Sequence, residues 1–186
     1  MKAAATGVPL KNTPARYGLL SKSLHWSNAV LIIGLIGLGC YMVGLTYYDR
    51  WYNAALAWHK SLGLVALALA MVMIGWHWYS PPPTPLAAWQ SWERLAARIM
   101  QAVLLVMMIV IPLSGYMIST SAGQGVEMFG LLRIPALWHG DSTLRDGAIA
   151  AHFYAAYGTA LLVIGHAGAA LKHHFVNRDE TLRRML

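Results

Sequence analysis

The stretch AHFYAAYGTALLVIGHAGAALKHHF, residues Ala151–Phe175, has the composition of one apolar helix, yet it contains two histidines well inside it. His152 and His166 are fourteen residues apart, which is about 21 Å along a helix that rises 1.5 Å per residue. Fourteen steps of about 100° return to within roughly 40° of the starting direction, so both side chains lie on one side of the helix at two depths. Because imidazole is costly to bury in lipid without a partner, each of these histidines needs one.

The composition predicts an all-α integral membrane protein. The chain is 58% hydrophobic and 11% charged, whereas a soluble domain carries roughly 25% charged residues. Four apolar runs reach the length of about 20 residues that crosses a bilayer, and they cover about residues 24–45, 54–79, 95–118 and 148–175. The first run lacks the cleavage site of a signal peptide, and the single cysteine, Cys40, excludes a disulfide framework. We therefore expect residues 1–186 to form one membrane domain, a four-helix bundle.

The basic residues predict how the bundle is oriented. Four spans place both termini and the connection between the second and third spans on one side. Ten of the fourteen Lys and Arg residues fall on that side: Lys2, Lys11, Arg16, Lys22, Arg94, Arg98, Lys172, Arg178, Arg183 and Arg184. The positive-inside rule makes this side cytoplasmic, so both termini are expected there. The net charge of +7 is thereby explained by topology and by anionic membrane lipid, and it does not require nucleic acid as a partner.

The longest connection, residues 121–147, follows the third span on the outer side. A structureless connection of that length is uncommon. Its glycine, proline and aromatic residues predict a partly folded cap on the outer face.

Two further histidines match the depths of the first two. His25 opens the first span at the inner face, like His166, and His59 lies near the outer start of the second span, like His152. Two axial histidines from facing helices are what a six-coordinate b haem needs. Glycines near these positions leave room for a flat macrocycle or for close helix contact: Gly34, Gly37, Gly39, Gly63, Gly158, Gly165 and Gly168.

Two alternatives compete with haem at these histidines. A single histidine in a membrane helix is as often a hydrogen-bonded structural residue as a ligand, but four at paired depths on three of four spans favour ligands. Zinc is less favoured, because neither depth offers a third protein ligand. The ten methionines and the aromatic residues are interpreted as packing residues and interfacial anchors.

The sequence resembles the bacterial cytochrome b561 family, which is related to the cytochrome b subunits of nickel-iron hydrogenases. The likeness runs from about Arg16 to Leu186 and rests on four segments: RYGLLSKSLHWSNAVLIIGLIGLGCYM, WHKSLGLVALAL, IPLSGYM and GHAGAALKHHFVNRDETLRRML. It implies a four-helix bundle with two b haems, whose ligands fall on His25, His59, His152 and His166. In the best-known branch the protein is an oxidoreductase of the bacterial inner membrane. It takes electrons from superoxide at the periplasmic face and passes them to ubiquinone.

The resemblance also implies roles for other residues. The first histidine of the HH pair, His173, corresponds to a quinone contact, and the alternative is an interfacial pair beside Lys172 that touches lipid phosphate. Family members often carry arginine near the end of the second span, as partners for haem propionates. Here Met73 and His77 stand at or near those places, so His77 or Lys22 becomes the propionate candidate.

On the outer side, the segment before His152 lacks the lysine that a superoxide oxidase would place near its ligand to draw the anion in. Arg133, Arg145 and Lys60 are the candidates for donor-side steering, although four acidic residues balance them: Asp49, Glu127, Asp141 and Asp146.

Three functions are therefore open at the level of sequence. The first is a superoxide:ubiquinone oxidoreductase. The second is an electron-transfer subunit that docks a separate redox partner protein through the long outer connection. The third is a haem-free membrane protein such as a small transporter, which predicts no Soret band.

Overall fold

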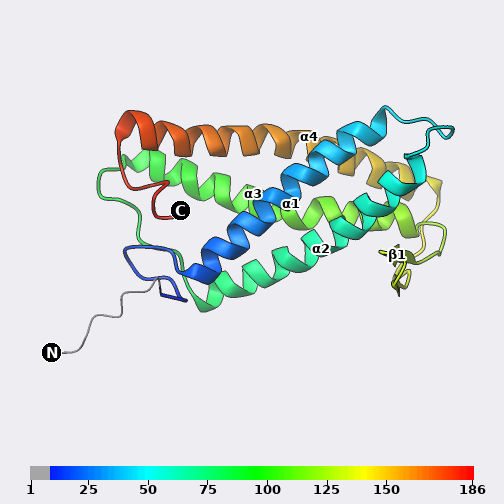
Figure 1. The fold of residues 1–186 in the computed structure, drawn as a ribbon, viewed down its shortest axis with the longest axis horizontal. Coiled ribbons are helices and arrows are strands. Elements are labelled where there is room, and N and C mark those ends of the chain that lie inside the picture. Colours follow the sequence, from blue (N-terminus) through cyan, green and yellow to red (C-terminus); the bar gives the residue numbers. More distant parts are fainter. Residues whose placement is uncertain (1–8) are drawn as a thin grey trace.

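The computed structural model describes residues 9–186 and shows an all-α bundle built from four long helices (Figure 1). They are α1 (Leu19–Val43), α2 (Tyr52–Tyr79), α3 (Ser91–Thr120) and α4 (Ser142–Lys172), and α4 continues into a π-helical turn, η1 (His173–Asn177). All four are long and apolar enough to cross a membrane. The predicted fold class, a membrane four-helix bundle, is confirmed.

The N-terminal ends of all four helices lie before the apolar runs that predicted them, and polar residues cap two of these ends. The fourth helix begins at Ser142, and Asp141 caps it by accepting the Leu144 N–H at 2.9 Å. The third begins at Ser91, where Gln90 and Glu93 form a reciprocal capping box. Hydropathy marks the part of a helix that meets lipid, whereas caps mark where its backbone hydrogen bonds begin.

The helices do not pack on one another equally. The most extensive interfaces join α3 to α4, α1 to α2 and α2 to α3, while α1 and α4 make the smallest interface. Helices α1 and α2 run obliquely to α3 and α4 in Figure 1. The histidines of α4 therefore face α1 and α2 across positions where helix-to-helix packing is slight.

One end of the bundle gathers three separate parts of the chain, residues 9–18, 80–90 and 178–186, and is called the terminal end here (Figure 1). Asn12 N–H donates to Ser80 Oγ at 2.9 Å, Arg184 donates to the Thr84 backbone oxygen at 2.7 Å, and Lys22 Nζ donates to the Leu186 backbone oxygen at 2.7 Å. Lys2, which the orientation prediction counts on this side, lies outside the described residues. The membrane face of this end stays a prediction.

The opposite end, called the hairpin end here, carries a small antiparallel sheet (Figure 1). Strands β1 (Val126–Met128) and β2 (Leu132–Ile134) pair through Met128 and Leu132. Phe129 and Gly130 reverse the chain with positive φ angles of 53° and 68°, the backbone conformation that tight hairpins use. The Phe129 N–H donates to Ser61 Oγ at 2.9 Å, which fixes the hairpin to α2. The long connection is therefore partly folded, as its composition predicts.

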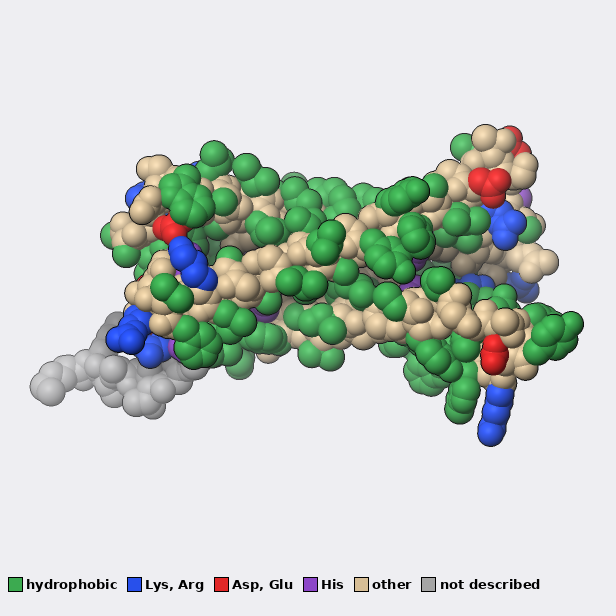
Figure 2. All heavy atoms as spheres, turned by 90° about the horizontal axis from the view of Figure 1, so that it is seen from above, with side chains coloured by type: hydrophobic (Ala, Val, Ile, Leu, Met, Phe, Trp, Pro, Cys, Tyr) green, Lys and Arg blue, Asp and Glu red, His purple; other side chains and the backbone are tan. Residues whose placement is uncertain are grey.

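The surface has the pattern of a protein that crosses lipid. Figure 2 shows apolar side chains over the middle of the molecule and charged ones gathered at its two ends. Val30 and Leu161 are both 71% exposed on the sides of the helices. Exposed apolar side chains are unfavourable in water, so the middle of this surface is suited to contact with the acyl chains of lipid.

Candidate functional site

The four histidines from three helices meet as two pairs. His59 of α2 faces His152 of α4 with ring centroids 6.1 Å apart and planes at 73°; this is the hairpin-end pair. His25 of α1 faces His166 of α4 with centroids 6.3 Å apart and planes at 55°; this is the terminal-end pair. Helix α4 thus contributes one ring to each pair, and the partners come from the helices that matching depth predicts.

The ring of His152 is oriented by α3. Its Nδ1 lies 2.9 Å from the Ile111 backbone oxygen and 3.2 Å from Ser114 Oγ. The carbonyl is an acceptor, so Nδ1 carries the proton and Nε2 keeps its lone pair. Metal-binding histidines are commonly fixed in this way, by a hydrogen bond from the nitrogen that does not bind the metal.

Two glycines allow the hairpin-end rings to lie close to neighbouring helices. A Cβ at Gly115 would lie 3.0 Å from Cε1 of His152, and a Cβ at Gly39 would lie 3.3 Å from Cε1 of His59. The Nδ1 of His59 is buried, and it has no hydrogen-bond partner among the described residues. A buried polar atom without a partner is costly unless the ring has another role.

The two propionate candidates are engaged elsewhere in the structure. Lys22 donates to the Leu186 backbone oxygen at 2.7 Å, one helical turn from His25. The exposed His77 places Nδ1 3.1 Å from the Met73 backbone oxygen of its own helix. Trp26, beside His25, donates its indole N–H to the Met185 backbone oxygen at 2.9 Å. The C-terminal residues therefore lie against α1 next to the terminal-end pair.

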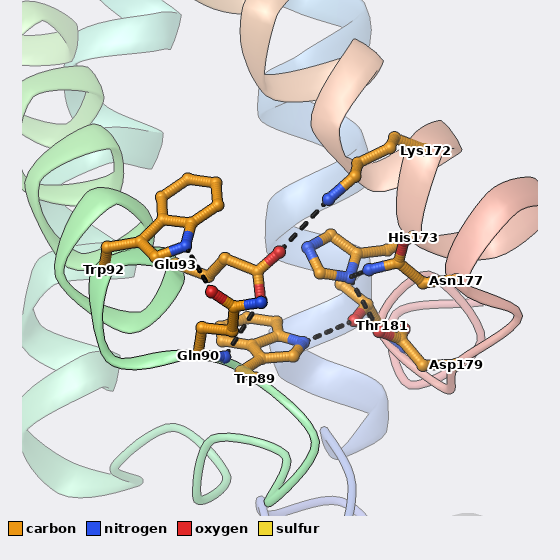
Figure 3. Close-up of polar contacts among 9 residues, drawn as sticks. All are labelled: Trp89, Gln90, Trp92, Glu93, Lys172, His173, Asn177, Asp179 and Thr181. Carbon is orange, nitrogen blue, oxygen red and sulfur yellow. Dashed lines mark hydrogen bonds and ion pairs between the residues drawn. The ribbon is translucent and has the colours of Figure 1, made fainter.

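A polar cluster surrounds His173 at the terminal end of α4 (Figure 3). The ring is only 8% exposed. Its Nδ1 lies 2.6 Å from Asp179 Oδ2 and 3.2 Å from Asn177 Nδ2. The indole of Trp89 lies beside the ring, with centroids 5.3 Å apart and planes at 37°. His173 is therefore held inside the protein and does not lie open to lipid headgroups.

Asp179 keeps its charge in this cluster. Partial burial raises the pKa of the Asp179 carboxyl, but hydrogen bonds from Thr181 and His173 outweigh burial and leave that pKa below its usual range. Close by, Lys172 Nζ and Glu93 Oε1 form an ion pair at 3.1 Å. The carboxylate next to His173 is thus ionised at neutral pH.

At the hairpin end, two of the three steering candidates share a cavity. Lys60 and Arg133 line a space of about 330 Å³ together with Glu127, between α2, the end of α3 and the hairpin. Arg145 is not among its lining residues; it lies exposed in the first turns of α4. Lys60 follows His59 in α2, but neither His59 nor His152 is among the residues that line the cavity.

Four residues of these clusters were not predicted from the sequence: Ser114, Gly115, Trp89 and Asp179. For Ser114 and Gly115 the sequence did contain a signal, because a serine inside an apolar run needs a hydrogen-bond partner in lipid. Trp89 and Asp179 lie in connections, and only the tertiary fold brings them to His173.

Comparisons with known proteins agree with this architecture. The family model described as prokaryotic cytochrome b561 matches residues 16–186. Cytochrome b561 homolog 2 of Escherichia coli (strain K12) is 41% identical over 175 residues, which cover 94% of this chain and 93% of that protein. Cytochrome b561 homolog 1 of the same organism is 31% identical over 113 residues, 59% of this chain and 61% of that protein.

The family match spans nearly all of the described bundle and every histidine of the two pairs. The chain therefore belongs to the prokaryotic cytochrome b561 family and is a multi-pass bacterial membrane protein that binds haem b.

Proposed function

We propose that this chain is a di-haem b cytochrome, in which His59 and His152 hold one haem and His25 and His166 hold the other. The observation that carries this proposal is the spacing of the two histidine pairs, with ring centroids 6.1 and 6.3 Å apart. A metal–imidazole bond is about 2.0 Å long and each nitrogen lies about 1.1 Å from its ring centre, so two rings on one metal are about 6 Å apart.

The surroundings of the rings support the same assignment. The Nδ1–H of His152 is bound to the Ile111 carbonyl, which leaves Nε2 to face the metal. Gly39 and Gly115 keep Cβ atoms away from the rings of the hairpin-end pair. The chain therefore provides paired, oriented imidazoles where the family requires axial ligands.

Bound haem supplies reversible one-electron transfer. The chain fixes two sites at two depths of the bundle, because His152 and His166 are separated by about 21 Å along α4. Ligation by two histidines would set the range of the potential of each haem. Electrons can then cross the bundle from the hairpin end to the terminal end.

We assign the two ends of this path to a donor and an acceptor. The cavity lined by Lys60 and Arg133 at the hairpin end suits a small anionic donor, for which superoxide is the first candidate. The cluster around His173, two helical turns beyond His166, suits the carbonyl oxygens of ubiquinone as acceptor. With basic residues concentrated at the terminal end, that end is cytoplasmic and the protein lies in the bacterial inner membrane.

A second function is favoured by one feature of the hairpin end. Leu131, Leu132 and Leu137 are 90%, 58% and 79% exposed on the long connection. Several exposed leucines within one connection suit contact with another protein. In this alternative the chain is an electron-transfer subunit that receives electrons from a docked redox partner protein and does not react with superoxide.

Haem content tests the ligand assignment. The pyridine haemochrome of the pure protein should give two haem b per chain. His59→Ala and His152→Ala should each remove the same spectral component, and His25→Ala and His166→Ala the other. His139→Ala is the control, because its ring faces no second histidine among the described residues, and it should retain two haems. One haem in the wild type, or loss of one component from both His25→Ala and His152→Ala, would contradict the proposal.

Reduction by superoxide separates the two functions. The oxidoreductase requires that a superoxide source reduce the wild-type protein faster than free haem, with transfer to ubiquinone afterwards. The subunit alternative requires no such reduction, together with a redox protein that binds the hairpin end.

A further inference from the structure

The chain takes an unfavourable backbone path to bring Asp179 to His173. After α4, residues His173–Asn177 form a π-helical turn, a feature that is rare and frequent at functional sites. Arg178 then adopts a left-handed conformation with φ 55°, which costs a non-glycine residue about 1 kcal/mol or more. The Asp179 N–H donates to the His173 backbone oxygen at 3.1 Å. This turn folds the carboxylate of Asp179 back onto the ring of His173.

The two nitrogens of His173 are in different environments. Nδ1 is held by Asp179 at 2.6 Å and also lies near Asn177, on the side of the ring that Figure 3 shows turned to these residues. Nε2 makes no hydrogen bond within residues 9–186. Trp89 lies beside the ring and limits its rotation. The cluster thus fixes the ring with one nitrogen occupied and the other available.

We propose that His173 is the proton donor for quinone reduction and that Asp179 is its positioning residue, an inference that rests on the proposed function. Asp179 accepts the Nδ1–H of His173 at 2.6 Å, which fixes the orientation and the tautomer of the ring. The Nε2–H then points at a carbonyl oxygen of the bound quinone. The arrangement is that of a buried carboxylate that orients a histidine for proton transfer.

The step balances in electrons and protons. A quinone takes up two electrons and two protons to become a quinol, and the proposed electron path supplies the electrons one at a time. For each proton, the Nε2–H bond of His173 breaks and an O–H bond forms on a quinone oxygen. The neutral ring regains its proton from water at the terminal end, and a second cycle delivers the second proton.

The other charges that face His173 are already paired. Glu93 of α3 and Lys172 of α4 form an ion pair at 3.1 Å, so their effects on the ring largely cancel. Trp89, from the connection before α3, brings no charge. Asp179, from the C-terminal segment, is therefore the charged residue in direct contact with the His173 ring.

The pH dependence of the quinone step tests this inference. The protein is reduced with dithionite, and its reoxidation by a soluble ubiquinone analogue is followed between about pH 5 and pH 9, across the range in which histidine titrates. Donation requires a proton on Nε2, so the rate should fall as pH rises. Asp179→Asn keeps the size of the side chain and an acceptor oxygen but removes the charge, and should slow the quinone step about 100-fold at neutral pH and change its pH profile. The KM for the quinone should change little.

Three further variants make the result specific. Asp179→Glu should restore most of the wild-type profile. Glu180→Gln removes the adjacent carboxylate, which is exposed and paired with Arg183 at 2.9 Å, and should leave the profile unchanged. His173→Gln should slow the quinone step by about 100-fold or more at every pH. Haem content should be that of the wild type in all of them, which checks folding.

The outcomes distinguish the inference from the proposed function. If ubiquinone reoxidises the wild type and Asp179→Asn has the wild-type profile, the dyad is wrong and the acceptor assignment stands. If Glu180→Gln shifts the profile as much as Asp179→Asn, a general surface charge explains the effect and the inference is also wrong. If ubiquinone does not reoxidise the wild type, the acceptor assignment fails and the dyad fails with it.

Discussion

The ring of His152 shows how a few atoms decide what a histidine can do in a membrane. The Ile111 carbonyl and the Ser114 hydroxyl hold its Nδ1, and Gly115 lies against the ring with no side chain to displace it. Because α3 supplies all three contacts, α3 orients a ring that belongs to α4. The hydrogen bond to Ile111 determines the tautomer of His152, and the absence of a side chain at Gly115 leaves space for the ring.

Replacement of Gly115 should affect one haem only. The new Cβ of Gly115→Ala would lie 3.0 Å from Cε1 of His152, so the ring must move away from α3. A shift of a few tenths of an ångström is enough to relieve this contact, so the hydrogen bonds of Nδ1 are weakened. We expect the haem of the hairpin-end pair to be retained less tightly, by up to about 10-fold, with its visible spectrum altered, while the other haem is unchanged. Spectra recorded during haem titration of the apoprotein measure this.

Gly75→Ala is the matched control, since a Cβ at that position of α2 meets nothing within 4 Å. It should leave both haems unaffected. Equal loss of both haems in Gly115→Ala would show a general folding defect and contradict the local account.

At the scale of elements, a serine hydroxyl of α2 helps to join the hairpin to the bundle. Ser61 is 1% exposed on α2, and its Oγ accepts the Phe129 N–H at 2.9 Å. The ring of Phe129 also meets Trp58 edge-on at 5.5 Å. The two strands of the hairpin are only three residues long each. The contacts of Phe129 therefore determine how firmly the hairpin is held over the cavity that Lys60 lines.

Ser61→Ala should loosen the hairpin and leave the helices intact. The Phe129 N–H loses its acceptor, which costs about 1–2 kcal/mol and should speed amide exchange in residues 126–134 about 5- to 30-fold. Hydrogen exchange followed by mass spectrometry measures this. Ser27→Ala, on an exposed face of α1, is the control, and equal acceleration in both variants would contradict the role of Ser61.

At the scale of the whole molecule, opposite ends carry different charge arrangements. Basic residues are numerous at the terminal end, in line with the orientation that the positive-inside rule predicts. The hairpin end has fewer basic residues, but Lys60 and Arg133 share one cavity. Glu127 lines the same cavity and lies opposite Arg133 in the hairpin, so the excess there is one positive charge. Such a local excess can steer an anion.

Charge reversal in this cavity should slow an anionic donor. Lys60→Glu and Arg133→Glu should each reduce the rate of haem reduction by superoxide about 10-fold or more at low ionic strength. The loss should shrink with added salt, because a Debye length of about 8 Å at 0.15 M screens the field. Arg145→Glu, outside the cavity, should have a much smaller effect. Equal slowing by Arg145→Glu would favour net charge over the cavity, and reoxidation by ubiquinone should be unchanged throughout.

The number of helices, their approximate bounds and the depth of each histidine follow from the sequence alone. These properties are local, because lipid requires about 20 apolar residues in a helix and the rise per residue fixes depth along it. Because the depth of each histidine is fixed, few other histidines could be the partner of His152 or His166. The pairs His59–His152 and His25–His166 could therefore be predicted from hydropathy and spacing, and their role as haem ligands stays a prediction.

The polar surroundings of these histidines depend instead on the tertiary structure. Loop and terminal segments have no membrane depth to fix them, so nothing local places Asp179 on His173 or separates Arg145 from the cavity of Lys60 and Arg133. The left-handed turn at Arg178 is likewise held by the contacts it makes, since its backbone conformation is unfavourable alone. Long-range packing therefore determines which polar residues meet at each end of the bundle, whereas hydropathy determines where the membrane spans lie.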